Sequence, residues 1–65
     1  MNELDALSRV VYKYIAEHNG QTILMKNLEN ETAITQATLR KKIKLLIEKG
    51  FISKDGKNFS VIKEA

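Results

Sequence analysis

The segment from residue 34 to residue 62 constrains the fold of this chain most, because it joins a basic amphipathic helix directly to a short, tight hairpin. Thr35 is a good residue to cap the start of a helix, and Gly50 after Lys49 is a typical stop signal. Between them, three large aliphatic residues recur at helical spacing and predict one inward-facing stripe. These residues are Leu39, Ile43 and Leu46.

The residues after this helix predict a β-hairpin. Two stretches that flank Asp55 and Gly56 carry aromatic and β-branched side chains, which favour strands. The Asp-Gly dipeptide tolerates positive φ and suits a two-residue type I′ turn. Lys54 and Lys57 stand on either side of it, so the tip of the hairpin is basic. The two stretches are residues 51–53 and 58–62.

A first helix is expected over residues 3–18, where six apolar residues form one stripe. Asn2 or Asp5 can cap its start, and Asn19 with Gly20 marks its end. The stripe consists of Leu4, Leu7, Val10, Val11, Tyr14 and Ile15.

Residues 21–24 can add a strand to the hairpin, giving a three-stranded antiparallel sheet. The helix that follows has no Ser, Thr or Asp just before its expected start, so its first residue is placed between Thr22 and Asn27. The predicted order is helix, strand, helix, helix, strand, strand, an α+β arrangement. A chain of 65 residues holds one core, so residues 1–65 are expected to form a single domain.

This arrangement and its motif resemble winged helix-turn-helix domains. There the pattern I-(S/T)-x-x-(T/S)-(V/L)-x-x-x-I-x-x-L-x-x-x-G-(L/F)-I precedes a short hairpin and an aromatic-x-aliphatic closing strand. The resemblance covers most of the chain and implies three helices packed with a small three-stranded sheet. It is specific for this fold rather than for one family within it. The matching residues are Ile34, Thr35, Thr38, Leu39, Ile43, Leu46, Gly50, Phe51 and Ile52, with Phe59 and Val61 in the closing strand.

The second helix departs from the resemblance. In many relatives this helix and the turn after it read L-A-x-x-L-G-I-(S/T), whereas the corresponding residues here are Leu28, Glu29, Thr32 and Ala33. Glu29 in place of a small packing residue suggests a rotated or loosely docked helix. Ala33 in place of glycine means that the turn either avoids positive φ or costs about 1 kcal/mol or more.

The positive charge is concentrated on the third helix and the hairpin. The net charge of +3 is modest, but residues 40–57 carry seven basic and two acidic residues, a local charge of +5. Residues 1–39 carry three basic and five acidic ones. In the fold that the chain resembles, the third helix and the hairpin touch DNA, so the pattern predicts an electrostatic footprint for phosphate. A solvated, lysine-rich helix face is the plainer interpretation of such a run.

The resemblance and the helical period imply separate roles on DNA. Arg40 and Gln36 can pair bidentately with guanine and adenine in the major groove, and Ala37 and Thr38 can approach a thymine methyl. The lysines are expected to meet phosphates, which fix the register without reading sequence. The candidate DNA-binding residues are Thr35, Gln36, Ala37, Thr38, Arg40, Lys41, Lys42, Lys44, Lys54 and Lys57.

Other functions find less support in the sequence. The chain has no cysteine, so it has no disulfide framework and no thiolate metal site. His18, the single histidine, is expected at the C-terminal end of the first helix, where a cation interacts favourably with the helix dipole. The chain has no glycine-rich phosphate loop, no Ser-His-Asp set and no pair of carboxylates flanked by apolar sequence, so neither an enzyme nor a cofactor is expected. The chain also lacks an apolar run of about 18 residues, so a cytoplasmic protein without membrane contact is expected. The resemblance to DNA-binding domains implies a nucleoid-associated protein of prokaryotic or phage type.

The sequence leaves the biological role and the partners open. Double-stranded DNA is the expected partner of a transcriptional regulator or of a plasmid, phage or chromosome maintenance protein. The alternatives are a nonspecific nucleoid-type binder and a winged domain that binds proteins, for which mixed or acidic charge on the third helix is expected. A left-handed-duplex binder is disfavoured because the chain has no proline or tryptophan. Leu45, about 120° from the core direction, is a candidate contact in a homodimer or larger assembly, whereas Ile47 is expected at the core edge.

Overall fold

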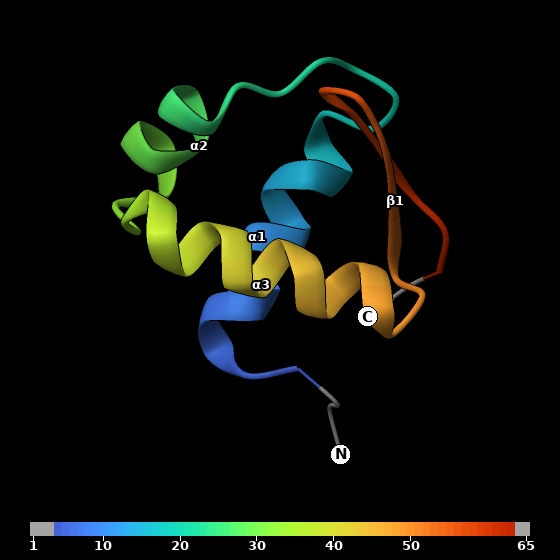
Figure 1. Cartoon of the computed structure of the whole chain (residues 1–65), viewed down its shortest axis with the longest axis horizontal. Coiled ribbons are helices and arrows are strands. Elements are labelled where there is room, and N and C mark those ends of the chain that lie inside the picture. The colour runs from blue at the N-terminus through green and yellow to red at the C-terminus, as the bar shows by residue number, and fades with distance from the viewer. Residues whose placement is uncertain (1–3, 64–65) are drawn as a thin grey trace.

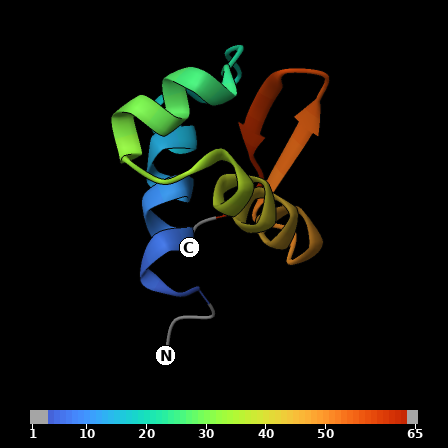
Figure 2. The ribbon, with the colours of Figure 1, turned by 60° about the vertical axis from the view of Figure 1, so that its left-hand side comes forward.

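The computed structural model describes residues 4–63, and within this range the chain forms three helices followed by one antiparallel hairpin. Figure 1 shows α3 crossing over α1, with α2 above one end of α3 and the hairpin beside the other end. In Figure 2, α1 and the hairpin lie on different sides of α3. The elements are α1 (Ala6–Glu17), α2 (Met25–Thr32), α3 (Gln36–Glu48), β1 (Ile52–Asp55) and β2 (Asn58–Val61).

The start of α1 is capped by Asp5, whose carboxylate accepts a hydrogen bond from the backbone N–H of Ser8 at 2.8 Å. Of the two expected caps, Asn2 lies outside the described residues. The expected apolar stripe is wrong at Leu7 and Val10, which are 43% and 44% exposed. The buried seam follows a heptad-like spacing that places those two residues on its flanks. This seam consists of Leu4, Ser8, Val11 and Ile15.

The second helix is held mainly by one residue, because Leu28 is fully buried while most of α2 faces outward. Its N-cap is Leu24, which offers no side-chain hydrogen bond, in agreement with the weak start signal in the sequence. The helix ends at Ala33, whose φ of 59° and ψ of 23° are left-handed. The turn therefore adopts the positive φ that glycine would accept without strain.

The third helix has the predicted inner face, since Leu39, Ile43 and Leu46 are all buried. Its C-terminal end is closed by two reverse hydrogen bonds, from Gly50 N to Ile47 O at 3.0 Å and from Phe51 N to Leu46 O at 2.9 Å. Together with the φ of 80° at Gly50, these bonds form a Schellman motif. This motif turns the chain directly into β1.

Thr35 occupies the N-cap position of α3, as predicted, but its side chain makes no capping hydrogen bond to the backbone. The Thr35 hydroxyl instead donates to the hydroxyl of Thr38 at 3.2 Å. The first backbone N–H groups of α3 are therefore not satisfied by Thr35.

The hairpin is confirmed, but its turn is shifted by one residue. Asp55 pairs with Asn58, so the two-residue loop is Gly56 and Lys57 rather than Asp55 and Gly56. Of these two, Gly56 alone has a positive φ, at 64°. A type I′ turn needs positive φ at both central positions, whereas a type II′ turn needs it only at the first. The turn therefore follows the type II′ pattern, and Lys57 lies within the loop.

The predicted third strand is reduced to an isolated bridge between Thr22 and Asn58. Residues 20–23 still form two backbone hydrogen bonds with Phe59 of β2, the shorter from Gly20 N to Phe59 O at 2.7 Å, and a third from Ile23 N to Lys57 O of the loop at 2.9 Å. The described sheet nevertheless has two strands. The pairing stops early because Leu24 is already the N-cap of α2, so the chain leaves the sheet after Ile23.

The C-terminal end of the described chain packs back on α1. The Tyr12 hydroxyl donates to the carbonyl of Lys63 at 2.9 Å, and the Tyr12 ring meets Phe51 edge to face at 6.2 Å. The Lys63 ammonium lies 4.5 Å from the centroid of the Phe51 ring. These contacts complete a core formed by Leu4, Val11, Ile15, Ile23, Leu28, Ile34, Leu39, Ile43, Leu46, Phe51, Ile52 and Phe59.

Candidate functional site

A groove of about 710 Å³ lies between α3, the hairpin and residues 23–25. Four of the predicted DNA-binding residues line it, two from α3 and two from the hairpin. Their positive charge is opposed in the groove only by Glu48 among the described residues. The four residues are Arg40, Lys44, Lys54 and Lys57.

The floor of this groove is apolar and comes from three separate parts of the chain. Phe59 is buried at 1% exposure, while Leu24 and Ile47 are 44% and 39% exposed. The ammonium of Lys54 lies 5.9 Å from the centroid of the Phe59 ring, so the Lys54 stem extends over the floor. The floor residues are Ile23, Leu24, Met25, Ile43, Ile47 and Phe59.

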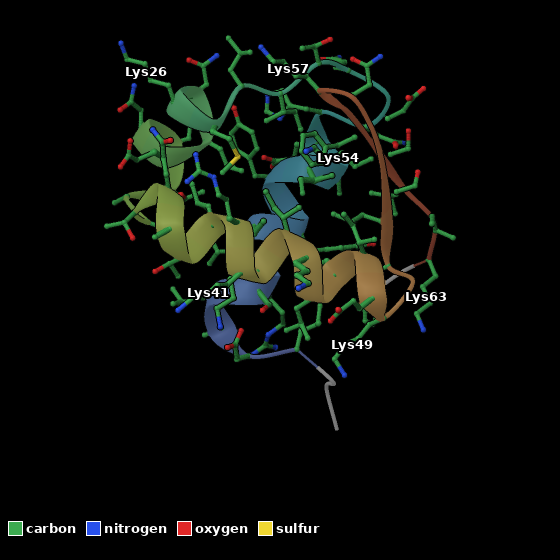
Figure 3. The ribbon with its side chains drawn as sticks, in the orientation of Figure 1. Lys26, Lys41, Lys49, Lys54, Lys57 and Lys63 are labelled. Carbon is green, nitrogen blue, oxygen red and sulfur yellow. The ribbon has the colours of Figure 1, made fainter. Side chains whose placement is uncertain are left out.

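The remaining lysines of the predicted site lie elsewhere. Figure 3 shows Lys41 and Lys49 on the side of α3 opposite to Lys54 and Lys57. The structure therefore divides the positive charge of the third helix between two sides. Only one of these sides is shared with the hairpin.

Lys42 is engaged with α1. Its ammonium donates to Asp5 Oδ2 at 2.6 Å, and its side chain is only 21% exposed. The Lys42 hydrogen bond, helped by the Ser8 N–H, holds the pKa of the Asp5 carboxyl well below its usual value. The phosphate contact expected of Lys42 would have to compete with this ion pair.

The N-terminal turn of α3 is partly occupied by internal contacts. Gln36 Nε2 donates to Glu29 Oε1 at 3.2 Å, so an adenine contact by Gln36 would require that bond to break. Thr38 is half-buried and accepts the Thr35 hydroxyl. Ala37, by contrast, is exposed, as are Arg40 and Lys44 farther along the helix.

The expectations for Leu45 and Ile47 are reversed by the structure. Leu45 is half-buried, which weakens its candidacy as a dimer contact, and Ile47 is exposed rather than part of the core edge. Ile47 lines the groove between α3 and the hairpin, and its side chain remains exposed there. The sequence signal that could have revealed this floor is the consecutive apolar run Ile23, Leu24 and Met25, which leads into the short helix α2.

His18 is located at the end of α1, as predicted. It is the C-cap, its Nδ1 lies 2.9 Å from the carbonyl oxygen of Tyr14, and its ring stacks on Tyr14 at 4.3 Å. Among residues 4–63, no group of three or more His, Cys, Asp or Glu side chains could hold a metal ion. No helix in that range is long and apolar enough to cross a membrane.

Comparisons of the chain with protein families, with curated proteins and with solved structures found no match.

Proposed function

We propose that this protein binds duplex DNA in the manner of winged helix-turn-helix domains, with α3 in the major groove and the hairpin against the backbone. The observation that carries this proposal is that Arg40 and Lys44 of α3 share one groove with Lys54 and Lys57 of the hairpin. Two consecutive elements thus present four cations around one groove, as phosphate binding requires. The proposed role is transcriptional regulation or plasmid, phage or chromosome maintenance.

Arg40 is the proposed base-reading residue. It is exposed on α3, has no ion-pair partner among the described residues, and carries a planar fork that matches the O6 and N7 acceptors of guanine. Ala37, one turn earlier and also exposed, is suited to contact with a thymine methyl. Gln36 would contact adenine only after its hydrogen bond to the Glu29 carboxylate is broken.

The lysines are proposed to hold phosphates. Lys54 and Lys57 at the hairpin and Lys44 on α3 suit this role because all three are exposed. Lys41 would reach the backbone only on the other side of α3. Lys42 is the weakest candidate because Asp5 already binds its ammonium.

Selection of bound sites from a pool of random duplexes, followed by fluorescence anisotropy on the selected site, tests this proposal. We expect enrichment of a short motif and an affinity that falls steeply with salt. Binding with no enriched motif would indicate a nonspecific nucleoid-type protein. Absence of any salt-dependent DNA binding would contradict the proposal and favour a protein-binding domain.

A further inference from the structure

We propose that the groove between α3 and the hairpin also binds an acidic amphipathic helix of a partner protein, and that this helix excludes DNA. The exclusion of DNA rests on the proposed function, whereas the binding of the helix does not. The floor of the groove is apolar, and a phosphate backbone gains nothing from contact with an apolar surface.

The floor offers apolar surface that the fold leaves uncovered. Leu24 and Ile47, from the start of α2 and the end of α3, are 44% and 39% exposed, and both line the same groove. Met25 adds a flexible side chain beside them, and such residues adapt to varied apolar partners. Scattered exposed apolar residues need no explanation, but three that line one concave surface indicate a binding site.

The charge of the rim selects an acidic occupant. Four cations border the floor, against the single carboxylate of Glu48 among the described lining residues. Arg40 and Lys44 stand one helical turn apart, about 6 Å along α3, while Lys54 and Lys57 belong to the opposite wall. A small molecule with one anionic head would need cations that converge on one point. Cations on two walls instead suit several carboxylates spread along an elongated partner.

The dimensions of the groove suit a helix. The α3 wall runs from Arg40 to Glu48, a rise of about 12 Å, which corresponds to two turns of a partner helix. A partner helix with large apolar residues on one face would place them between Ile47 and Leu24. Glutamates or aspartates on its flanks would then reach the cations of both walls. These are the cations that we propose for DNA, so the two partners cannot bind together.

The experiment uses the full chain and a synthetic, fluorescein-labelled amphipathic helix of about 15 residues, with leucines on one face and glutamates on both flanks. A second peptide carries lysines in place of the glutamates. The protein variants are Ile47→Ser and Leu24→Ser, and the matched control is Val10→Ser, because Val10 is 44% exposed on α1, away from the groove. Binding is measured by fluorescence anisotropy, and folding of each variant by circular dichroism.

We expect the glutamate peptide to bind, the lysine peptide not to bind, and Ile47→Ser and Leu24→Ser each to raise the Kd about tenfold. Val10→Ser should leave the Kd unchanged. Both groove variants should keep wild-type DNA affinity, and unlabelled glutamate peptide should displace labelled duplex from the wild-type protein. Peptide binding without DNA binding would uphold the helix site and overturn the proposed function.

Several results would overturn the inference itself. Equal effects of Ile47→Ser and Val10→Ser would mean that the peptide binds by charge alone, outside the groove. Tighter binding of dodecanoate than of the peptide would make the groove a small-molecule site. A wild-type dimer in sedimentation that Ile47→Ser converts to a monomer would make a second copy of the chain the occupant. DNA binding that the peptide fails to displace would remove the proposed competition.

Discussion

The carboxylate of Asp5 joins two helices, because Oδ1 accepts the Ser8 N–H at the start of α1 while Oδ2 accepts the Lys42 ammonium of α3. One side chain thus caps the first helix and ties it to the proposed recognition helix. The pKa of the Asp5 carboxyl is lowered from its ordinary value of 3.8 mainly by Lys42 and then by Ser8. The protein therefore has a defined acid-sensitive contact between α1 and α3.

Asp5→Asn is expected to lower the thermal midpoint at neutral pH, because asparagine preserves the cap but loses the ion pair. Because the pKa of Asp5 is lower in the folded state than in the unfolded state, the unfolded state binds the proton more readily. The free energy of unfolding therefore rises with pH between the folded-state and the unfolded-state pKa. The Asp5 contribution is fully present above 3.8 and is lost as the pH falls toward the lower folded-state pKa. Thermal melts between about pH 2 and pH 6 measure it.

In these melts the difference between wild type and Asp5→Asn should shrink as the pH falls, and added salt should also reduce it. Asp55→Asn is the control, since Asp55 is an exposed residue at the end of β1. A difference that is the same at every pH would show that the ion pair contributes nothing to stability.

Ala33→Gly is expected to stabilise the protein by about 0.5–1 kcal/mol. The left-handed conformation at Ala33 costs an L-residue about 1–2 kcal/mol, which glycine avoids, although glycine also gains entropy in the unfolded chain. Urea unfolding measures the change. Ala16→Gly, at an exposed position within α1, should instead destabilise by about 1 kcal/mol. If Ala33→Gly is equally destabilising, the turn does not have the conformation described above.

The sequence predicted best those features that depend on a few neighbouring residues. The inner face of α3 follows from the helical period of Leu39, Ile43 and Leu46, and the Schellman motif follows from Gly50. For the turn at Ala33, the missing glycine left two alternatives, and the structure shows the one with positive φ.

Features that depend on contacts between distant segments were predicted less well. The hairpin loop is Gly56 and Lys57 because Asp55 pairs with Asn58, a register that the Asp-Gly dipeptide alone does not fix. The exposure of Ile47 depends on how far the short hairpin extends over α3. No local pattern encodes that distance, nor the pairing of Lys42 with Asp5 across 37 positions of sequence.

Leu39→Ala is expected to destabilise the protein by about 2–5 kcal/mol, because Leu39 is fully buried on the inner face of α3. Denaturant unfolding measures the loss. The surface control is Lys13→Ala on α1, since Lys13 is exposed. Lys63→Ala would be a poor control because the Lys63 ammonium packs against Phe51. A loss no larger than that of Lys13→Ala would place Leu39 outside the core.

Lys54→Ala combined with Lys57→Ala is expected to weaken binding to all duplexes about equally. If each lysine neutralises one phosphate, the slope of log K against log salt should fall by about 0.9 for each contact. Anisotropy titrations over a range of salt concentrations provide the slope. The control is Arg9→Ala combined with Lys13→Ala, which removes the same charge from α1. Equal slopes for the hairpin double variant and wild type would show that the hairpin does not meet the backbone.

Arg40→Ala tests base readout most directly. Arg40 is exposed on α3 and lines the groove shared with the hairpin, and a bidentate contact with guanine contributes about 1–3 kcal/mol of discrimination. We expect this loss at the selected site, a much smaller loss on random duplex, and relaxed preference at one base pair. Arg9→Ala on α1 is the matched control, because it removes the same side chain away from the groove.

Arg40→Lys separates geometry from charge. Lysine keeps the positive charge but lacks the planar fork, so nonspecific affinity should be retained while specificity falls. Anisotropy on the selected and random duplexes measures both quantities. If Arg40→Ala weakens both duplexes equally, Arg40 is a phosphate anchor and the protein belongs with nonspecific binders. If neither duplex responds to Arg40→Ala, α3 does not enter the major groove, and the cations around the apolar floor are then left for a protein partner.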